Sequence, residues 1–186
     1  MHAPRYLVDH FLIAMPALDD PNFARGVTLI CQHDENGAMG VIINRESDFT
    51  LGEVLRQMDI PTQNPALASQ RVLMGGPVQT DRGFVLHDDP RDWSSTLRFG
   101  KLALTTSREI LVAMADGQGP ERQLLTLGYA GWTAGQLEEE IAANAWLTVP
   151  ADDAIVFRTP LAERWRAAAQ SIGVDLSRLS DDVGHA

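Results

Sequence analysis

The sequence lacks several features that would place a protein outside the cytoplasm. It has a single cysteine, Cys31, so no intramolecular disulfide can form, which agrees with a reducing compartment. No apolar run reaches the roughly 18 to 20 residues of a membrane-spanning helix, and residues 1–16 lack the basic and apolar regions of an export signal. We therefore expect a cytoplasmic protein with no membrane association.

Positive charge is also scarce. The chain carries a formal net charge of -10, only Lys101 is a lysine, and the arginines are scattered, with Arg164 and Arg166 the closest pair. Nonspecific binding of nucleic acid needs a locally basic face that neutralises phosphates. The sequence shows no such face, so direct nucleic-acid binding is disfavoured.

What is present is the composition of a soluble globular protein. Of 186 residues, 45% are hydrophobic and 22% are charged, which is far from disordered or membrane classes. This length favours one core. We expect a single domain over residues 1–186, with flexible ends at 1–9 and 180–186.

Alternating apolar residues and turn signals predict strands early in the chain. Residues 26–33 and 38–44 form a hairpin around the turn Asp34 to Gly37. Thr50 and Glu53 have capping-box spacing and begin a helix. Further strands are predicted at 71–74, 84–87, 96–105, 123–130 and 155–157, and further helices begin at Thr106, Thr133 and Thr159.

The order of these elements indicates the fold class. Strands come in pairs joined by tight turns and then give way to interspersed helices, without strict β-α-β alternation. We therefore expect an α+β fold with a mixed, mainly antiparallel sheet that helices cover in part. A doubly wound parallel sheet is the alternative.

Two segments, 75–87 and 127–147, concentrate glycine, aromatic and polar residues. We expect them to meet and form a shared concave binding surface, because function gathers in such loops beside an ordinary core. The candidate binding residues are Gly75, Gly76, Pro77, Asp81, Arg82, His87, Gly128, Gly131, Trp132 and Gln136.

These residues also have purely structural interpretations. The glycine pair is typical of a bulge or sheet corner, and Trp132 is typical of core packing. The strand-to-helix corner at Gly128, Gly131 and Thr133 is a possible anion site, although the following Glu138, Glu139 and Glu140 oppose it. Those three glutamates are most simply a solvated helix face.

Signals for catalysis or metal binding are weak. There is no H-E-x-x-H, cysteine pair or G-x-S-x-G motif, so no catalytic residue, cofactor or metal is predicted. His33-Asp34-Glu35 and His87-Asp88-Asp89 would form a metal site only if the two strand ends met. Cys31 alternates with Val27 and Leu29, which favours a buried structural thiol.

Several long motifs occur in a fixed order along the chain: HFLIAMP, DPNF, GAMGVIIN, GGPVQTDRGFVLH, LGYAGWTAGQLEEEIAANAWL and a closing GHA. In these the chain resembles the YqgE/AlgH family of bacterial proteins. The resemblance implies a large sheet partly curled into a half-barrel, flanked by helices, a cytosolic location and no established enzymatic activity. One branch of that family is labelled a regulator of alginate synthesis. Glu46 departs from the family pattern, which often has proline there.

Three functions remain open at this stage. The leading hypothesis is a regulatory protein that affects transcription through a protein partner bound at segments 75–87 and 128–136. The second is an enzyme that depends on a small molecule or metal, with His87 and nearby carboxylates as acid–base groups. The third is a transcriptional regulator that binds DNA itself, which the net charge disfavours.

Overall fold

Antiparallel hairpins build most of the sheet. A computed structural model describes residues 6–178, in which ten strands form one sheet of order β10-β1-β2-β3-β9-β6-β8-β7, while β5 pairs with β4 and β9. Among the described strand pairs only β5 and β9 run parallel. The strands are β1 (His10–Ala14), β2 (Val27–Asp34), β3 (Gly37–Ile42), β4 (Glu46–Thr50), β5 (Arg71–Met74), β6 (Val78–His87), β7 (Thr96–Phe99), β8 (Leu102–Thr105), β9 (Gln123–Thr133) and β10 (Trp146–Pro150). The expected α+β class with a mixed, mainly antiparallel sheet is confirmed.

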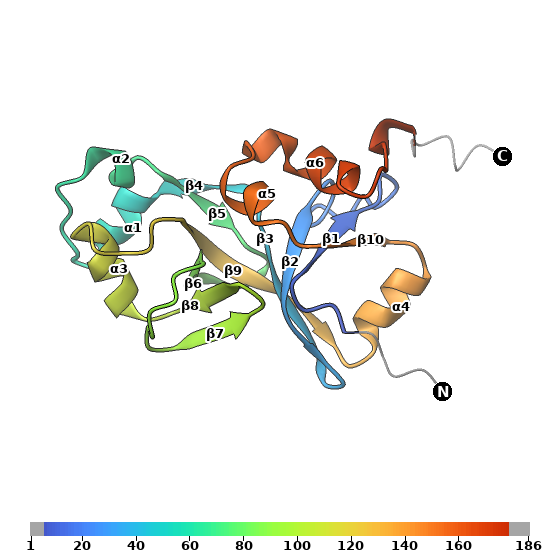
Figure 1. The fold of residues 1–186 in the computed structure, drawn as a ribbon, viewed down its shortest axis with the longest axis horizontal. Helices are drawn as coiled ribbons and strands as arrows, with labels where there is room; N and C mark the ends of the chain where they lie inside the picture. Colours follow the sequence, from blue (N-terminus) through green and yellow to red (C-terminus); the bar gives the residue numbers. More distant parts are fainter. Residues whose placement is uncertain (1–5, 179–186) are drawn as a thin grey trace.

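The sheet curls into a half-barrel, as the resemblance implied. The molecule has two lobes, one containing β4 to β8 and the other β1 to β3 and β10 (Figure 1). The long strand β9 runs through both, pairing with β5 and β6 near its start and with β3 near its end. The last strand of the order, β7, returns beside β2. The curl therefore gives the sheet a concave side.

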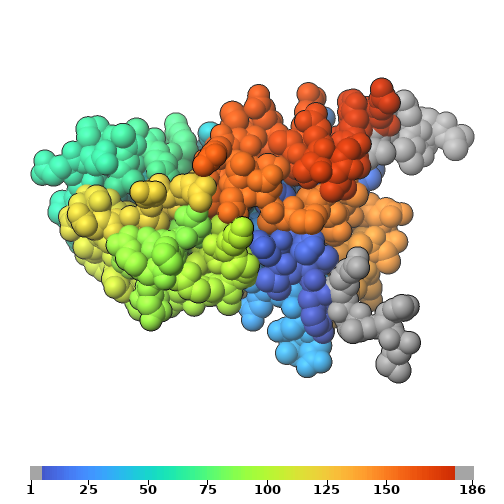
Figure 2. Space-filling model, viewed as in Figure 1, coloured from blue at the N-terminus to red at the C-terminus, as the bar shows by residue number. Residues whose placement is uncertain are grey.

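Short helices cover the two lobes differently. They are α1 (Leu51–Gln57), α2 (Pro65–Ala68), α3 (Arg108–Ala115), α4 (Gln136–Ala142), α5 (Asp153–Phe157) and α6 (Arg164–Gln170), with 3-10 turns η1 (Leu161–Glu163) and η2 (Leu176–Arg178). Helices α1 to α3 lie in one lobe, and α5 and α6 lie over β1 and β2 in the other (Figure 1). The space-filling view shows these C-terminal helices, in orange and red, along one edge of that lobe (Figure 2). No helix among residues 6–178 is both long and apolar enough to span a bilayer.

Of the two helix-capping boxes predicted from the sequence, one is confirmed and one is wrong. Thr50 and Glu53 form the predicted capping box at the start of α1. The predicted box at Thr106 and Glu109 is wrong: Ser107 precedes α3 without a side-chain cap, and the two residues bond instead to Ser95 and Ser94. The β7–β8 hairpin replaces the single strand predicted over 96–105.

The C-terminal part departs most from the expectation. Residues 155–157 belong to α5 rather than a strand, because the Asp152 side chain accepts the backbone N–H of Ala154 and begins a helix there. The helix predicted from Thr159 is broken into η1 and the seven-residue α6, and Gly173 follows it at φ 77°. Much of segment 75–83, expected as a loop, is the first half of β6.

Part of the N-terminal segment predicted to be flexible is bonded to strand β2. Of the predicted flexible ends, residues 1–5 and 180–186 lie outside the described residues. Leu7 is buried, its N–H donates to His33 Nδ1 over 3.0 Å, and the Asp9 N–H donates to Ile30 O. On the neighbouring strand β2, Cys31 is 2% exposed, and burial raises its thiol pKa, as expected for a structural cysteine.

Candidate binding cleft on the concave side of the sheet

A cleft opens on the concave side of the curled sheet. Its volume is about 890 Å3, and it is lined by residues of six strands that are consecutive in the sheet order, from β2 to β7. We call it the concave cleft. Its lining residues are Gln32, Ala38, Met39, Val78, Gln79, Arg82, Phe84, Ser95, Thr96, Leu97, Leu104, Thr106, Tyr129, Gly131, Trp132 and Thr133. The two glycine-bearing segments of the sequence therefore contribute to one surface.

Direct contact between two backbones brings these segments together. A Cβ on Gly75 would lie 2.4 Å from Gly128 O, and a Cβ on Gly76 would lie 2.1 Å from the Tyr129 carbonyl carbon. Gly128 has φ 75° and a Cβ there would meet Gly76 O at 2.4 Å. The glycines thus allow segment 75–76 to cross β9, which is the sheet-corner interpretation, and β9 occupies the space beside them.

A wide bulge in β6 places Arg82 at the cleft. Val78 pairs with Tyr129 and Gly83 with Leu127, so residues 79–82 leave the ladder. Bulges of this kind re-aim side chains at the rims of curled sheets. The Arg82 guanidinium lies 5.5 Å from the centroid of the Phe84 ring, which packs edge-on against Tyr129 at 5.9 Å. Among the described residues Arg82 has no carboxylate within ion-pair distance.

Apolar side chains exposed to solvent line the same cleft. Val78 on β6 and Leu97 on β7 are each 36% exposed, and both line the cleft. Exposed apolar groups near a cation are typical of protein recognition surfaces. The surface can therefore hold a partner by apolar contact and by a charge-assisted hydrogen bond from Arg82.

Trp132 lines the cleft and also packs into the core. It is buried, and with Phe23 and Trp146 it forms an aromatic cluster with ring centroids 5.4 to 6.2 Å apart. Glu140 Oε1 accepts both indole N–H groups, from Trp132 at 3.1 Å and from Trp146 at 2.9 Å. The solvated-face interpretation thus holds for Glu139, whose exposed side chain makes no hydrogen bond or ion pair among the described residues, but not for Glu140.

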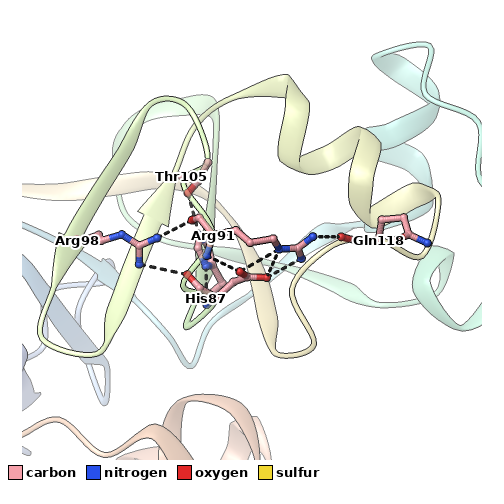
Figure 3. A network of polar contacts seen from close by, with 6 residues as sticks. His87, Arg91, Arg98, Thr105 and Gln118 are labelled. Carbon is pink, nitrogen blue, oxygen red and sulfur yellow. Dashed lines mark hydrogen bonds and ion pairs between the residues drawn. The ribbon is translucent and has the colours of Figure 1, made fainter.

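His87 is buried away from the cleft in a closed hydrogen-bond chain (Figure 3). Its Nδ1 accepts the Asp89 N–H at 3.0 Å, so Nε2 carries the proton and donates to Thr105 Oγ1 at 2.8 Å. Thr105 in turn contacts Thr96 Oγ1 at 2.7 Å, and Thr96 donates to Trp93 O. Burial lowers the imidazole pKa, and the neighbouring carboxylate of Asp89 opposes that shift.

The carboxylate of Asp89 is fixed by arginine in the same network. Arg91 Nε and Nη2 both donate to it, the latter at 2.6 Å, and these bonds hold the Asp89 pKa below its usual range. Arg98 donates to the carbonyls of Asp89 and Arg91 (Figure 3). Both ring nitrogens of His87 and the carboxylate of Asp89 are therefore engaged in structural hydrogen bonds.

The two histidine–carboxylate strand ends do not form a metal site. His33 is buried, with Nε2 donating to Glu138 at 2.6 Å and Nδ1 accepting from Leu7. Within residues 6–178 no group of three or more histidine, cysteine, aspartate or glutamate residues is placed to hold a metal ion. Glu138, also expected on a solvated face, thus bonds to His33.

The structure distributes the predicted binding residues over four environments. Arg82, Gly131 and Trp132 line the concave cleft, and Gly75, Gly76 and Gly128 are buried where segment 75–76 crosses β9 and do not line it. Asp81, with Arg82, faces an adjoining hollow of about 500 Å3. Pro77, Gln136 and His87 line neither.

Other lining residues were not predicted from the sequence. Val78, Gln79, Phe84 and Tyr129 lie within or beside the predicted segments, and Leu97 comes from a distant hairpin. Val78 was expected in a loop and Leu97 among the apolar residues of a strand, and neither was singled out as a binding residue; both are 36% exposed.

Comparison with known proteins gives a consistent result over nearly the whole chain. A family model described as AlgH-like matches residues 11–177. A UPF0301 protein of Stenotrophomonas maltophilia is 60% identical over 183 residues, which cover 98% of this chain and 97% of the relative. A UPF0301 protein of Xanthomonas axonopodis pv. citri is 59% identical over 184 residues, covering 98% of each chain.

Solved structures agree with the fold. The solution structure of the AlgH protein from Pseudomonas aeruginosa has a TM-score of 0.81 and 53% identity, covering 100% of this chain and 99% of that one. A crystal structure of a Corynebacterium diphtheriae protein has a TM-score of 0.73 at 22% identity, covering 97% and 94% of the two chains. The second likeness concerns the fold alone.

Proposed function

The chain belongs to the AlgH-like family, and from that premise we propose that it is a cytoplasmic regulatory protein that binds a partner protein in the concave cleft. The family resemblance favours a role in regulating alginate-type exopolysaccharide synthesis. The observation that carries the proposal is the meeting of Val78, Leu97 and Arg82 around one open hollow.

The chemistry of the cleft supports a protein partner. Two exposed apolar side chains supply area for hydrophobic contact, and Arg82 supplies a cation without an internal carboxylate among the described residues. Interfaces are enriched in arginine and aromatic side chains, and Arg82, Phe84 and Tyr129 line the cleft together. An open cleft also fits a protein segment better than a small ligand, which is usually enclosed.

The two other hypotheses receive less support. His87, on which the enzyme hypothesis depended, is buried and bonded on both ring nitrogens. A net charge of -10 opposes DNA binding.

The test is affinity purification from native cytosol with wild-type protein and cleft variants. Val78→Asp and Leu97→Asp each place a carboxylate on an exposed wall of the cleft, so we expect loss of the specific partner and at least tenfold weaker binding to that partner once purified. Val112→Asp is the matched control, because Val112 is 38% exposed on α3 and lines neither hollow. Equal partner recovery by all three variants would contradict the proposal.

A further inference from the structure

A separate hollow, of about 660 Å3, lies on segments of the chain that do not line the concave cleft. Its walls are the loop before β2, the turn after β3 and the segment from Thr159 through α6, and it shares no lining residue with the cleft. Arg25, Arg45 and Arg166 line it together with Trp165. We call it the arginine hollow.

The charge of this hollow is opposite to that of the molecule. Three guanidinium groups line it, while Glu163 is the only carboxylate among its described lining residues. The whole chain carries a net charge of -10. The fold thus gathers arginines that are scattered in the sequence at one place.

Two of these guanidinium groups are held in position. Arg45 Nη1 donates to the carbonyls of Pro21 and Asn22, and Nη2 donates to Ala24 O at 2.7 Å. Arg25 lies 5.4 Å from the centroid of the Trp165 ring. Carbonyl oxygens and an aromatic face orient a guanidinium without neutralising its charge. The positive charges of Arg25 and Arg45 are therefore still available to attract an anion.

A fourth arginine is buried between the walls of the hollow. Arg164 is 5% exposed; its Nε donates to Thr159 O at 2.9 Å and its Nη1 to Ile43 O, next to lining residue Asn44. No carboxylate of the described residues lies within 4.0 Å of it. Burial lowers the Arg164 pKa to about 10. Buried charges in proteins are normally paired, so this cation calls for a counter-charge nearby.

We propose that the arginine hollow is a binding site for a phosphate group, carried by inorganic phosphate or by a small phosphate monoester. Arg25 and Arg166, both exposed at the hollow, supply N–H forks that can reach a ligand, and guanidinium forks match phosphate oxygens in geometry and charge. The fixed Arg45 and the buried Arg164 contribute positive potential. The volume suits a small metabolite.

The experiment titrates the full chain with inorganic phosphate and follows the arginine Nε–H and Trp165 indole signals by NMR. We expect saturable shifts at Arg25, Arg166 and Trp165 with a Kd on the order of 1 mM, and no such shifts with chloride at equal ionic strength. Arg25→Gln and Arg166→Gln should each weaken binding at least tenfold. Because both side chains are exposed, each variant should keep its Tm within about 2 °C of wild type.

Arg56→Gln is the matched control, since Arg56 is an exposed arginine on α1 outside the hollow. It should bind phosphate as wild type does. Shifts that do not saturate, that chloride reproduces, or that persist in Arg25→Gln and Arg166→Gln would overturn the site. Tighter binding of adenosine monophosphate than of inorganic phosphate would identify a monoester as the ligand, and equal binding would identify the free ion.

The phosphate-site proposal and the partner-binding proposal can be tested separately, because the two hollows share no lining residue. Val78→Asp should leave phosphate binding unchanged, because Val78 does not line the arginine hollow.

Discussion

The imidazole of His87 has two partners that only its neutral form satisfies. A proton on Nδ1 would face the Asp89 N–H, which is itself a donor, so protonation breaks that bond. Together with burial, this explains why the pKa of His87 is lowered. A histidine at the end of a strand beside two aspartates resembled an acid–base group in the sequence, but the structure gives it a packing role.

The first prediction concerns pH. Because the folded-state pKa of His87 lies below 6.5, the unfolded chain takes up the proton first as the pH falls. The contribution of His87 to the free energy of unfolding is therefore fully present above pH 6.5 and is lost as the pH falls below it toward the folded-state pKa. Urea unfolding between pH 5.0 and 7.5 measures this slope.

His87→Gln is the variant that isolates the effect. It should lower the free energy of unfolding at pH 7.5 by about 1–3 kcal/mol, because buried bonds are lost, and its stability should depend less on pH below 6.5. A variant with the same pH slope as wild type would show that another group causes it.

Single residues also show how far the concave cleft was predictable. Arg82 and Trp132 were chosen for their residue type in glycine-rich segments, and both line the cleft. Leu97 was not, because an apolar residue in a strand usually packs inward. Its exposure depends on where β7 lies relative to β2, which no local pattern encodes.

At the scale of elements, short-range chemistry was the most predictable part. The Asp34–Gly37 turn and the Thr50–Glu53 capping box each depend on residues within a few positions, and both were correct. Residues 155–157 were wrong because Ile, Val and Phe favour strands, while the Asp152 cap that decided the outcome lies just before them. An apolar run this short is ambiguous until its flanking residues are weighed.

Helix α4 is attached to the sheet by Glu140, which gives the second prediction. Glu140→Ala leaves two mostly buried indole N–H groups without their acceptor, so we expect the free energy of unfolding to fall by about 2–4 kcal/mol. Tryptophan fluorescence should change, since both indoles lose a charged neighbour. Glu139→Ala, on the exposed face of the same helix, should cost less than about 0.5 kcal/mol. Equal effects of the two changes would refute a docking role for Glu140.

At the scale of the whole molecule, the crossing of segment 75–76 over β9 connects distant parts of the chain. Gly76→Ala would place a methyl group against the Tyr129 backbone, so the third prediction is a loss of about 3 kcal/mol or more in urea unfolding. Gly117→Ala is the control: Gly117 has φ 76° with nothing within 4 Å, so only the backbone conformation costs about 1–2 kcal/mol. Similar losses in both variants would mean that the crossing tolerates a side chain. Gly76 is consequently a poor probe of binding.

The overall fold class followed from the sequence, whereas the distribution of charge did not. Paired strands with tight turns indicated an antiparallel sheet, and the half-barrel curl came only from the family resemblance. Arg25, Arg45 and Arg166 are far apart in sequence, so a scan along the chain showed no basic face. Their meeting depends on α6 lying over the start of β2 and the end of β3.

Strand β9 forms backbone hydrogen bonds with β3 in one lobe and with β5 and β6 in the other. If it separates from its neighbours in either lobe, backbone amides in the other lobe also lose their partners. We expect its central amides to exchange with deuterium only through opening of the entire sheet. A partner held in the cleft would then slow exchange in strands it never touches.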